Sequence, residues 1–270
     1  MVELSNAEFK EMYDYIRTRY GLNLEKKRYL IESKLWIELA RTKSDTYEEY
    51  WRKLRNDGTG AMERRMMNLL TTNYTFFCRE EQHFEFIRRN VIPAFPAGRK
   101  RPLRIWSAGC ATGQECYTLA MELADCSRLG ILKVPFAILG TDISETAVAT
   151  AQKGMYGSAD YARLPAAWQS IYCESFQDGE FRVKESIRAY TDFMRQNLAD
   201  LPPMRPTYDI IFCRNVLIYF REKESVILID KLTDALLPGG YLMIGHTESL
   251  LAIETELKYI EPAIYRKPVA

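Results

Sequence analysis

Residues that bind transition metals or form disulfides in recognisable patterns are scarce in this sequence. Its 270 residues include only two histidines, His83 and His246, which lie far apart in the chain. None of the six cysteines forms a C-x-x-C pair. Because a zinc site requires a cluster of such ligands, we predict no metal. Reduced thiols are the expected state of the cysteines, since a chain of this size can bury a core without disulfide bonds.

The sequence also lacks an excess of charge of one sign and any long apolar run. Lys and Arg total 37 against 36 Asp and Glu, so the net charge at pH 7 is +1. A dedicated nucleic-acid binder carries a strongly basic surface, and this balance argues against nucleic acid as a partner. No uncharged apolar run approaches the ~18 residues of a membrane span, and the start MVELSNAEF is unlike a signal peptide. We therefore expect a cytoplasmic protein without membrane insertion.

The first third of the chain contains helical patterns only. Ser5 and Glu8 form a capping box ahead of an amphipathic run that Gly21 ends. Further amphipathic stretches follow at 25–41, 46–54, 62–70 and 80–91. The segment PAFPAGRKRP favours neither helix nor strand. These patterns predict an all-α N-terminal domain over 1–92 and a linker over 93–102.

After the linker, strand and helix patterns alternate. Short apolar runs predict buried strands at 103–108, 136–142, 208–213 and 241–245, and helical patterns cover 113–125 and 222–236. Such alternation is typical of a doubly wound parallel sheet, so we predict an α/β domain over 103–270. The alternating segment 180–194 indicates a small antiparallel hairpin, which places a β-subdomain insertion around 175–194.

A glycine turn follows the first predicted strand, in residues 107–115 (SAGCATGQE). Gly109 lets the backbone turn without a Cβ, so a ligand can approach the main chain closely. The turn lacks both the G-x-G-x-x-G of a dinucleotide site and the GK[ST] of a phosphate loop. Asp142 ends the second strand, where a carboxylate can accept hydrogen bonds from the two hydroxyls of an adenosine ribose. An adenosine compound without phosphate, S-adenosylmethionine (SAM), fits this combination.

A plainer interpretation of the same residues remains open at this point. Gly109 and Gly113 can serve strand–helix packing, and Asp142 can cap the helix that begins near Ser144. Taken together, and with LPGG at 237–240 before the last strand, the residues favour the methyl-donor fold.

Two further stretches carry a more specific likeness. Residues 70–80 (LTTNYTFFCRE) lie between the helical part and the sheet, and residues 211–220 (IFCRNVLIYF) cover the third core strand and the turn after it. With the glycine turn and GHTES at 245–249, they resemble the chemotaxis receptor methyltransferases, the CheR family. The resemblance runs over essentially the whole chain, with the helical domain first.

The resemblance implies transfer of a methyl group from SAM to the γ-carboxylates of receptor glutamates, with S-adenosylhomocysteine (SAH) as the product. It implies that Arg79 and Tyr219 lie beside the transferring methyl. Beside Gly109, the donor would be held by residues that match the family's motif, namely Asn73, Thr75, Arg79, Glu115, Asp142, Asn197, Leu198, Arg214 and Asn215.

Local chemistry offers alternatives for several of these side chains. Asn73 and Thr75 also suit helix capping. Arg79 at a helix start opposes the helix dipole, which mildly favours a role with an anion or cofactor over a solvated surface position. Tyr219 could be a buried core tyrosine. Glu115 could be a first-turn acid that the helix dipole stabilises.

The resemblance also implies a partner, the cytoplasmic helical bundle of a chemoreceptor. Lys27, Lys34 and Arg41 recur every seven residues and could form a basic docking face, although glutamates on the same predicted helix suit a plain solvated face equally well. In some family members the β-subdomain binds a receptor C-terminal pentapeptide by strand addition. Here SFQDGE, at 175–180, is short and lacks a glycine-rich extension, so such peptide binding is doubtful.

Two other functions stay open from the sequence. One is SAM-dependent methylation of another substrate such as nucleic acid; against nucleic acid, residues 215–218 (NVLI) lack the prolines of an N/D-P-P-Y/F motif. The other is a non-catalytic protein that binds SAM or SAH and docks a partner, because binding and transfer share residues.

Overall fold

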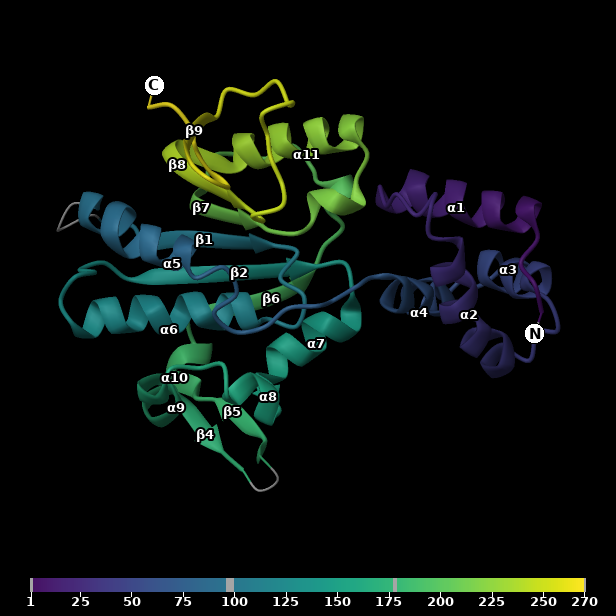
Figure 1. Cartoon of the computed structure of the whole chain (residues 1–270), viewed down its shortest axis with the longest axis horizontal. Helices are drawn as coiled ribbons and strands as arrows, with labels where there is room; N and C mark the ends of the chain where they lie inside the picture. Colours follow the sequence, from purple (N-terminus) through teal and green to yellow (C-terminus); the bar gives the residue numbers. More distant parts are fainter. Residues whose placement is uncertain (1, 96–99, 177–178, 270) are drawn as a thin grey trace.

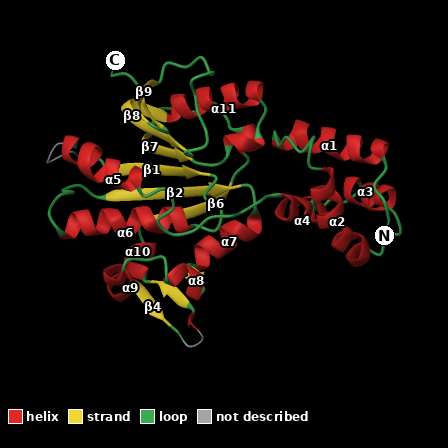
Figure 2. Cartoon of the chain, viewed as in Figure 1, coloured by secondary structure: helices red, strands yellow, loops and turns green. Residues whose placement is uncertain are grey.

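The computed structural model describes residues 2–95, 100–176 and 179–269. A small helical domain lies beside a larger domain built on a twisted sheet, and a small antiparallel sheet projects from the larger domain (Figures 1 and 2). The proline- and glycine-containing residues 96–99 of the expected linker lie outside the described residues. No helix among the described residues is long and apolar enough to cross a bilayer.

Four helices form the N-terminal domain, namely α1 (Asn6–Tyr20), α2 (Arg28–Thr42), α3 (Tyr47–Arg55) and α4 (Ala61–Leu70). The predicted capping box begins α1: the Ser5 hydroxyl accepts from the Glu8 N–H, and the Glu8 carboxylate accepts from the Ser5 N–H. Gly21 ends the helix with φ of 70°, a conformation that glycine adopts without strain. The inward faces of the helices pack around fully buried side chains such as Met12, Ile31 and Tyr50.

Seven strands form the main sheet in the order β6-β2-β1-β7-β8-β10-β9. Their bounds are β1 (Leu103–Ala108), β2 (Phe136–Asp142), β6 (Thr191–Arg195), β7 (Tyr208–Cys213), β8 (Leu236–Ile244), β9 (Lys258–Glu261) and β10 (Ile264–Arg266). Strands β6, β2, β1, β7 and β8 are parallel, and β10 is antiparallel to both neighbours. The strand order reverses at β1, so the edge where β1, β2 and β7 end is the expected ligand site of an open α/β sheet.

Alternating side chains place one hydrophobic core on each face of the sheet. Ile105 and Ile210 belong to the core beneath α5 (Gln82–Phe86) and α6 (Gln114–Arg128), whereas their neighbours Trp106 and Ile211 belong to the core beneath α11 (Glu222–Ala235). A further helix, α7 (Glu145–Lys153), follows β2 and begins at the predicted N-cap, Ser144. The doubly wound α/β prediction is therefore confirmed, and the strands at 103–108, 136–142 and 208–213 have the expected bounds.

The predicted hairpin at 180–194 is wrong. A three-stranded antiparallel sheet does exist, in the order β3 (Met155–Tyr156), β5 (Phe181–Val183) and β4 (Cys173–Ser175), with α8 (Ser158–Tyr161) and α9 (Ala166–Tyr172) between its strands. After the short α10 (Glu185–Arg188), however, β6 pairs in parallel with β2 in the main sheet. Polar and apolar residues alternate in the same way in an exposed edge strand and in a hairpin strand, so the sequence pattern could not distinguish the two structures.

The chain passes from the core of the helical domain to the core of the sheet domain before the predicted linker. The core of the helical domain ends with Leu70, and Phe77 already packs in the core of the sheet domain. The segment predicted as one helix over 80–91 is α5 followed by a π-helical turn, η1 (Ile87–Val91), and a 3-10 turn, η2 (Ile92–Ala94). The buried apolar side chains of this segment belong to the core of the sheet domain, and the rings of Phe84 and Phe86 contact Phe212 of β7 and Tyr241 of β8. The placement of residues 77–92 in the helical domain is therefore corrected.

Candidate active site

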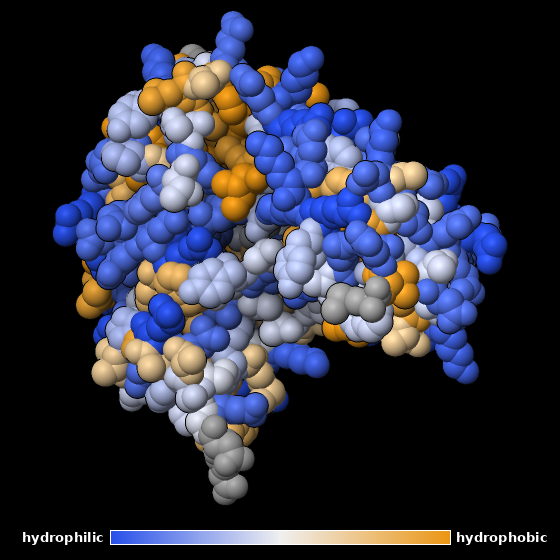
Figure 3. Space-filling view, turned by 45° about the vertical axis from the view of Figure 1, so that its right-hand side comes forward, coloured by the Kyte–Doolittle hydropathy of each residue, from blue (hydrophilic) through white to orange (hydrophobic). Residues whose placement is uncertain are grey.

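A cavity of about 420 Å³ opens at the carboxyl ends of β1, β2 and β7 and is closed on one side by the helical domain. This volume is within the ~300–1,000 Å³ of small-molecule sites. The space-filling view shows the surface hollowed between the two domains (Figure 3). Every residue that the sequence predicts for the site lines this cavity, namely Asn73, Thr75, Arg79, Gly109, Glu115, Asp142, Asn197, Leu198, Arg214, Asn215 and Tyr219.

The glycine turn brings backbone to the cavity wall. Gly109 has φ of 91°, and a Cβ at this position would collide with the Cγ2 atom of Val216 in the loop after β7. The N–H groups of Gly109 and Cys110 both donate to the carbonyl of Thr141, which joins the turn to the end of β2. Only glycine satisfies both the left-handed backbone and the close approach.

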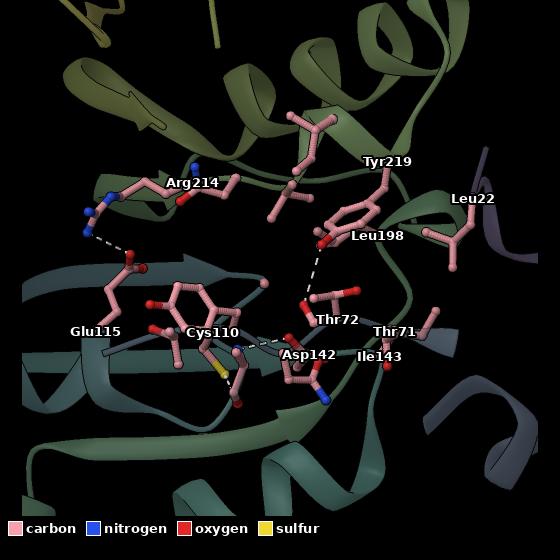
Figure 4. A pocket seen from close by; sticks show the side chains of 18 of the residues that line it. Leu22, Thr71, Thr72, Cys110, Glu115, Asp142, Ile143, Leu198, Arg214 and Tyr219 are labelled. Carbon is pink, nitrogen blue, oxygen red and sulfur yellow. Dashed lines mark hydrogen bonds and ion pairs between the residues drawn. The ribbon is translucent and has the colours of Figure 1, made fainter. Parts of the chain in front are cut away.

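Asp142 projects from the end of β2 towards the turn (Figure 4). Its Oδ2 accepts from the N–H of Ala111 at 2.9 Å, and its Oδ1 accepts from the N–H of Ser144 at 2.9 Å. Burial raises the pKa of this carboxyl, and the two backbone N–H groups oppose that shift. Each carboxylate oxygen has two lone pairs, so Asp142 keeps capacity to accept from a bound diol.

A buried guanidinium links the three walls of the cavity. Arg214 Nη1 lies 3.0 Å from Glu115 Oε2, and Arg214 Nε lies 3.2 Å from Glu80 Oε2. A third contact joins Arg214 Nη2 to the carbonyl oxygen of Arg79. Glu115 is held from its other side by the Ser107 hydroxyl, which donates to Oε1 at 2.7 Å. Arg79 Nε also lies 4.0 Å from Glu80 Oε1, so two guanidinium groups face the two carboxylates at this end of the cavity.

The segment between α4 and α5 forms the roof of the cavity. Asn73 Nδ2 donates to Ser144 Oγ at 3.2 Å, and the same hydroxyl donates to Asn68 of α4 at 3.1 Å. Arg79 lies in the turn before α5, whose first residue is Gln82, rather than at the helix start itself. Its guanidinium donates to the Tyr74 carbonyl at 3.0 Å and lies 5.7 Å from the centre of the Phe76 ring. These contacts keep Arg79 at the cavity wall.

Tyr219 lies opposite the roof, at the end of the 3-10 turn η5 (Leu217–Tyr219). Its hydroxyl donates to the Thr72 carbonyl at 3.4 Å (Figure 4). Tyr219 packs against the core of the helical domain, but it is only half-buried and lines the cavity, so the alternative of a buried core tyrosine does not apply.

Asn197 and Leu198 border the cavity after β6, at the start of the 3-10 turn η4 (Leu198–Asp200). The Asn197 side chain is already engaged, because Nδ2 donates to the Arg19 carbonyl at 2.9 Å and Oδ1 accepts from the Ala199 N–H at 3.1 Å. Asn197 therefore caps η4 and contacts the helical domain, and one amide hydrogen and one lone pair remain for a ligand.

Sequence reasoning missed Glu80 and the helical-domain wall of Tyr20, Leu22 and Leu24. It also missed that His83 and His246 meet, with ring centres 4.9 Å apart beside Glu80. Adjacency of this kind leaves no local sequence signal, because it depends on how α5 packs beside the end of β8.

The three side chains at that meeting point could offer metal ligands within 4.8 Å of one another. However, Glu80 Oε2 accepts from both Arg214 Nε and the His246 N–H, at 3.2 and 3.3 Å. Its lone pairs are occupied, and the guanidinium repels a second cation. Burial, with Arg214 and His246 nearby, lowers the pKa of His83 to about 3, so the imidazole is neutral. These contacts favour a packing role for His83 and His246 over a role as metal ligands.

The fold and the cavity together define a SAM-dependent methyltransferase. The doubly wound sheet, the glycine turn without phosphate-binding residues and the acid that ends β2 are the features that the sequence predicts for this class. The cavity offers Asp142 for ribose hydroxyls, apolar contacts from Ile143 and Leu198, and the Glu115–Arg214 pair for a zwitterion. The residues therefore fit SAM, whose amino-acid end carries both charges.

Comparison with known proteins identifies the family. A model of the CheR methyltransferase all-alpha domain matches residues 7–71, and a model of the CheR methyltransferase SAM binding domain matches residues 73–265. A chemotaxis protein methyltransferase of Borreliella burgdorferi is 34% identical over 98% of this chain and 96% of the relative. The chemotaxis protein methyltransferase Cher2 of Pseudomonas putida is 31% identical over 95% of each chain. The chain belongs to the CheR family of chemotaxis protein methyltransferases, and its cofactor is SAM.

Proposed function

We propose that this enzyme methylates glutamate γ-carboxylates of chemoreceptors, using Arg79 and Tyr219 beside the reacting methyl and the other cavity residues to hold the donor. The observation that carries the proposal is the convergence of all eleven predicted site residues on one cavity in a chain that matches both family domains. Bound SAM supplies a methyl group on a sulfonium, which is a good leaving group.

The residues present suit a reaction governed by positioning. A glutamate carboxylate has an ordinary pKa near ~4.3, so it is an anion at neutral pH and needs no general base. The site correspondingly places no histidine at the described cavity wall. Arg79 orients the incoming carboxylate, and Tyr219 donates a hydrogen bond near it. The roof and the helical domain exclude water, which strengthens both interactions.

Charge on α2 supports docking on an acidic receptor bundle. The acids near the basic face form ion pairs within the chain: Glu25 pairs with Arg221 at 2.8 Å, and Glu32 with Arg28 at 3.7 Å. The buried Glu38 pairs with Arg65 and with Arg41, so Arg41 does not remain free on this face. Lys27 and Lys34 make no ion pair among the described residues and are exposed. Hydrophilic side chains also dominate the helical domain in Figure 3. The face that remains is therefore positive, as an acidic helical partner requires.

Transfer of tritiated methyl from SAM to receptor-containing membranes tests the function. Base-labile label on receptor glutamates supports the proposal. Label on RNA or on a small molecule would instead support a methyltransferase of another substrate. Binding of SAM without transfer to any acceptor would support a non-catalytic binding protein.

We also propose that the chain recognises the receptor bundle without a C-terminal peptide. Residues 177–178 of the short loop lie outside the described residues, and the support comes from the length of 175–180. Removing the receptor's C-terminal residues should leave its methylation rate unchanged. A cytoplasmic location is likewise proposed, supported by six free cysteines.

A further inference from the structure

The buried carboxylate of Glu248 lies where the loops after β7 and β8 meet. Its Oε2 accepts from the N–H of Gly245 at 2.7 Å and from the N–H of Asn215 at 2.9 Å. Its Oε1 accepts from the N–H of Ile218 at 3.3 Å. The residue is only 9% exposed. One side chain thus satisfies three backbone donors from two loops that are distant in sequence.

No ion pair compensates this charge among the described residues, and backbone N–H groups hold it instead. Burial raises the pKa of Glu248, while the hydrogen bonds from Gly245, Asn215 and Ile218 oppose the shift. The facing titratable group is the Cys213 thiol at the end of β7, whose pKa burial also raises. A buried acid without a paired cation lowers stability unless its hydrogen bonds are complete. The hydrogen bonds that Glu248 accepts from the two loops are therefore what keeps it at this position.

The turn that Glu248 holds carries site residues. Asn215 has φ of 57°, a strained conformation for a residue other than glycine, and it directly follows Arg214. Gly245 approaches so closely that a Cβ there would lie 2.5 Å from Asn215 Nδ2 and 2.9 Å from Glu248 Oε2. Ile218, whose N–H donates to Glu248, directly precedes Tyr219 in the chain. The carboxylate therefore fixes the turn at both ends of the stretch that lines the cavity.

We propose that Glu248 is a positioning residue for donor binding, which holds the 214–219 turn in the conformation that presents Asn215 and Tyr219 to the cavity. The inference rests on the proposed assignment of this turn to the donor site. It goes beyond that assignment because Glu248 does not line the cavity and acts through backbone N–H groups alone.

The test is Glu248→Gln, which keeps the shape but turns an amide N–H toward backbone donors. We expect the Kd for SAH, measured by calorimetry, to rise on the order of tenfold. Because Tyr219 moves with the turn, kcat should fall as well. Glu254→Gln, at an exposed acid six residues along the chain, is the matched control and should leave both values unchanged.

A second control separates positioning from simple destabilisation. Ile264→Val trims a buried side chain of β10 outside the cavity and should lower the melting temperature without changing the Kd for SAH. If Glu248→Gln does not fold, Glu248→Asp is measured instead, and its shorter carboxylate should give a weaker defect in Kd of the same kind.

An unchanged Kd for SAH in a folded Glu248 variant, with only a lower melting temperature, overturns the inference. Failure of the wild-type protein to bind SAH is a different result, because it removes the proposed donor site itself. The two failures are therefore distinguishable within one calorimetric series.

Discussion

The N–H of Asn23 in the helical domain donates to the carbonyl of Tyr219 at 2.6 Å. Lys27, from the same segment, places its ammonium 5.0 Å from the centre of the Tyr219 ring. The proposed catalytic tyrosine is thus held by the helical domain as well as by its own turn. A domain that could have been a separate docking module forms part of the active-site wall.

That contact depends on Gly21, so we predict that Gly21→Ala weakens donor binding. A Cβ there would lie 2.7 Å from the Phe220 ring and 2.9 Å from the Ala199 methyl, at a backbone φ of 70°. The helical domain must then shift from the site, and the Kd for SAH should rise severalfold in calorimetry. Gly58→Ala, in open space, is the control; equal Kd values in the two variants would contradict the prediction.

Substitution of the proposed catalytic pair should separate turnover from binding. Tyr219→Phe removes one hydroxyl, and Arg79→Ala removes one cation, so each should lower kcat by about tenfold or more while changing the Kd for SAH less. Methyl transfer under saturating SAM is the measurement. Tyr259→Phe, on the exposed strand β9, should leave the rate unchanged. A full rate in either site variant removes that residue from catalysis.

Asp142→Asn should weaken SAH binding by on the order of tenfold, because the amide nitrogen would face one of the two backbone donors, the N–H of Ala111 or that of Ser144. The wild-type affinity should also fall on acidification. Since burial raises the pKa of Asp142 above its ordinary ~3.9, protonation begins at a higher pH than for a free aspartate. Calorimetry across pH measures both effects. Asp234→Asn, at an exposed position, serves as control, and a wild-type pH profile in the Asp142→Asn variant would contradict the assignment.

Gly109→Ala should abolish or strongly reduce donor binding, because the added Cβ collides with Val216 and requires a positive φ. Gly130→Ala has a similar φ of 72° but no neighbour within 4 Å, so it controls for backbone strain alone. The difference in Kd for SAH between the two variants isolates the collision. Combining Gly109→Ala with Val216→Ala should recover part of the loss, and no recovery would mean that strain dominates.

The lowered pKa of His83 predicts that the free energy of unfolding depends on pH. Its pKa is lowered to about 3 in the folded protein, below the ordinary ~6.5, so its contribution is complete above ~6.5 and is lost as the pH falls towards 3. Urea unfolding should show a loss of about 1.4 kcal/mol per pH unit within that window from this group. His83→Phe should flatten this part of the profile, whereas His246→Gln, which removes only the smallest of the three causes of the shift, should retain most of it. An unchanged slope in His83→Phe would contradict the prediction.

Local sequence determined several helix ends, the strands at 103–108, 136–142 and 208–213, and the kind of ligand. The capping box at Ser5, the turn at Gly21 and the run 136–142 are set by neighbours along the chain, so their patterns predicted them correctly. The missing phosphate motifs argued against dinucleotides, and the acid at Asp142 favoured an adenosine ribose, from the sequence alone. Short-range preferences of this kind survive folding because the final packing agrees with them.

Tertiary structure alone decided the rest. The choice between a hairpin and the edge of the main sheet for 191–195 depended on pairing with β2, since both share a period of two residues. The meeting of Arg214 with Glu80 and Glu115, and of Glu248 with the Asn215 turn, joins residues 33 to 134 positions apart. Such contacts arise because parallel strands end at one edge of a sheet, and no local pattern records which ends become neighbours.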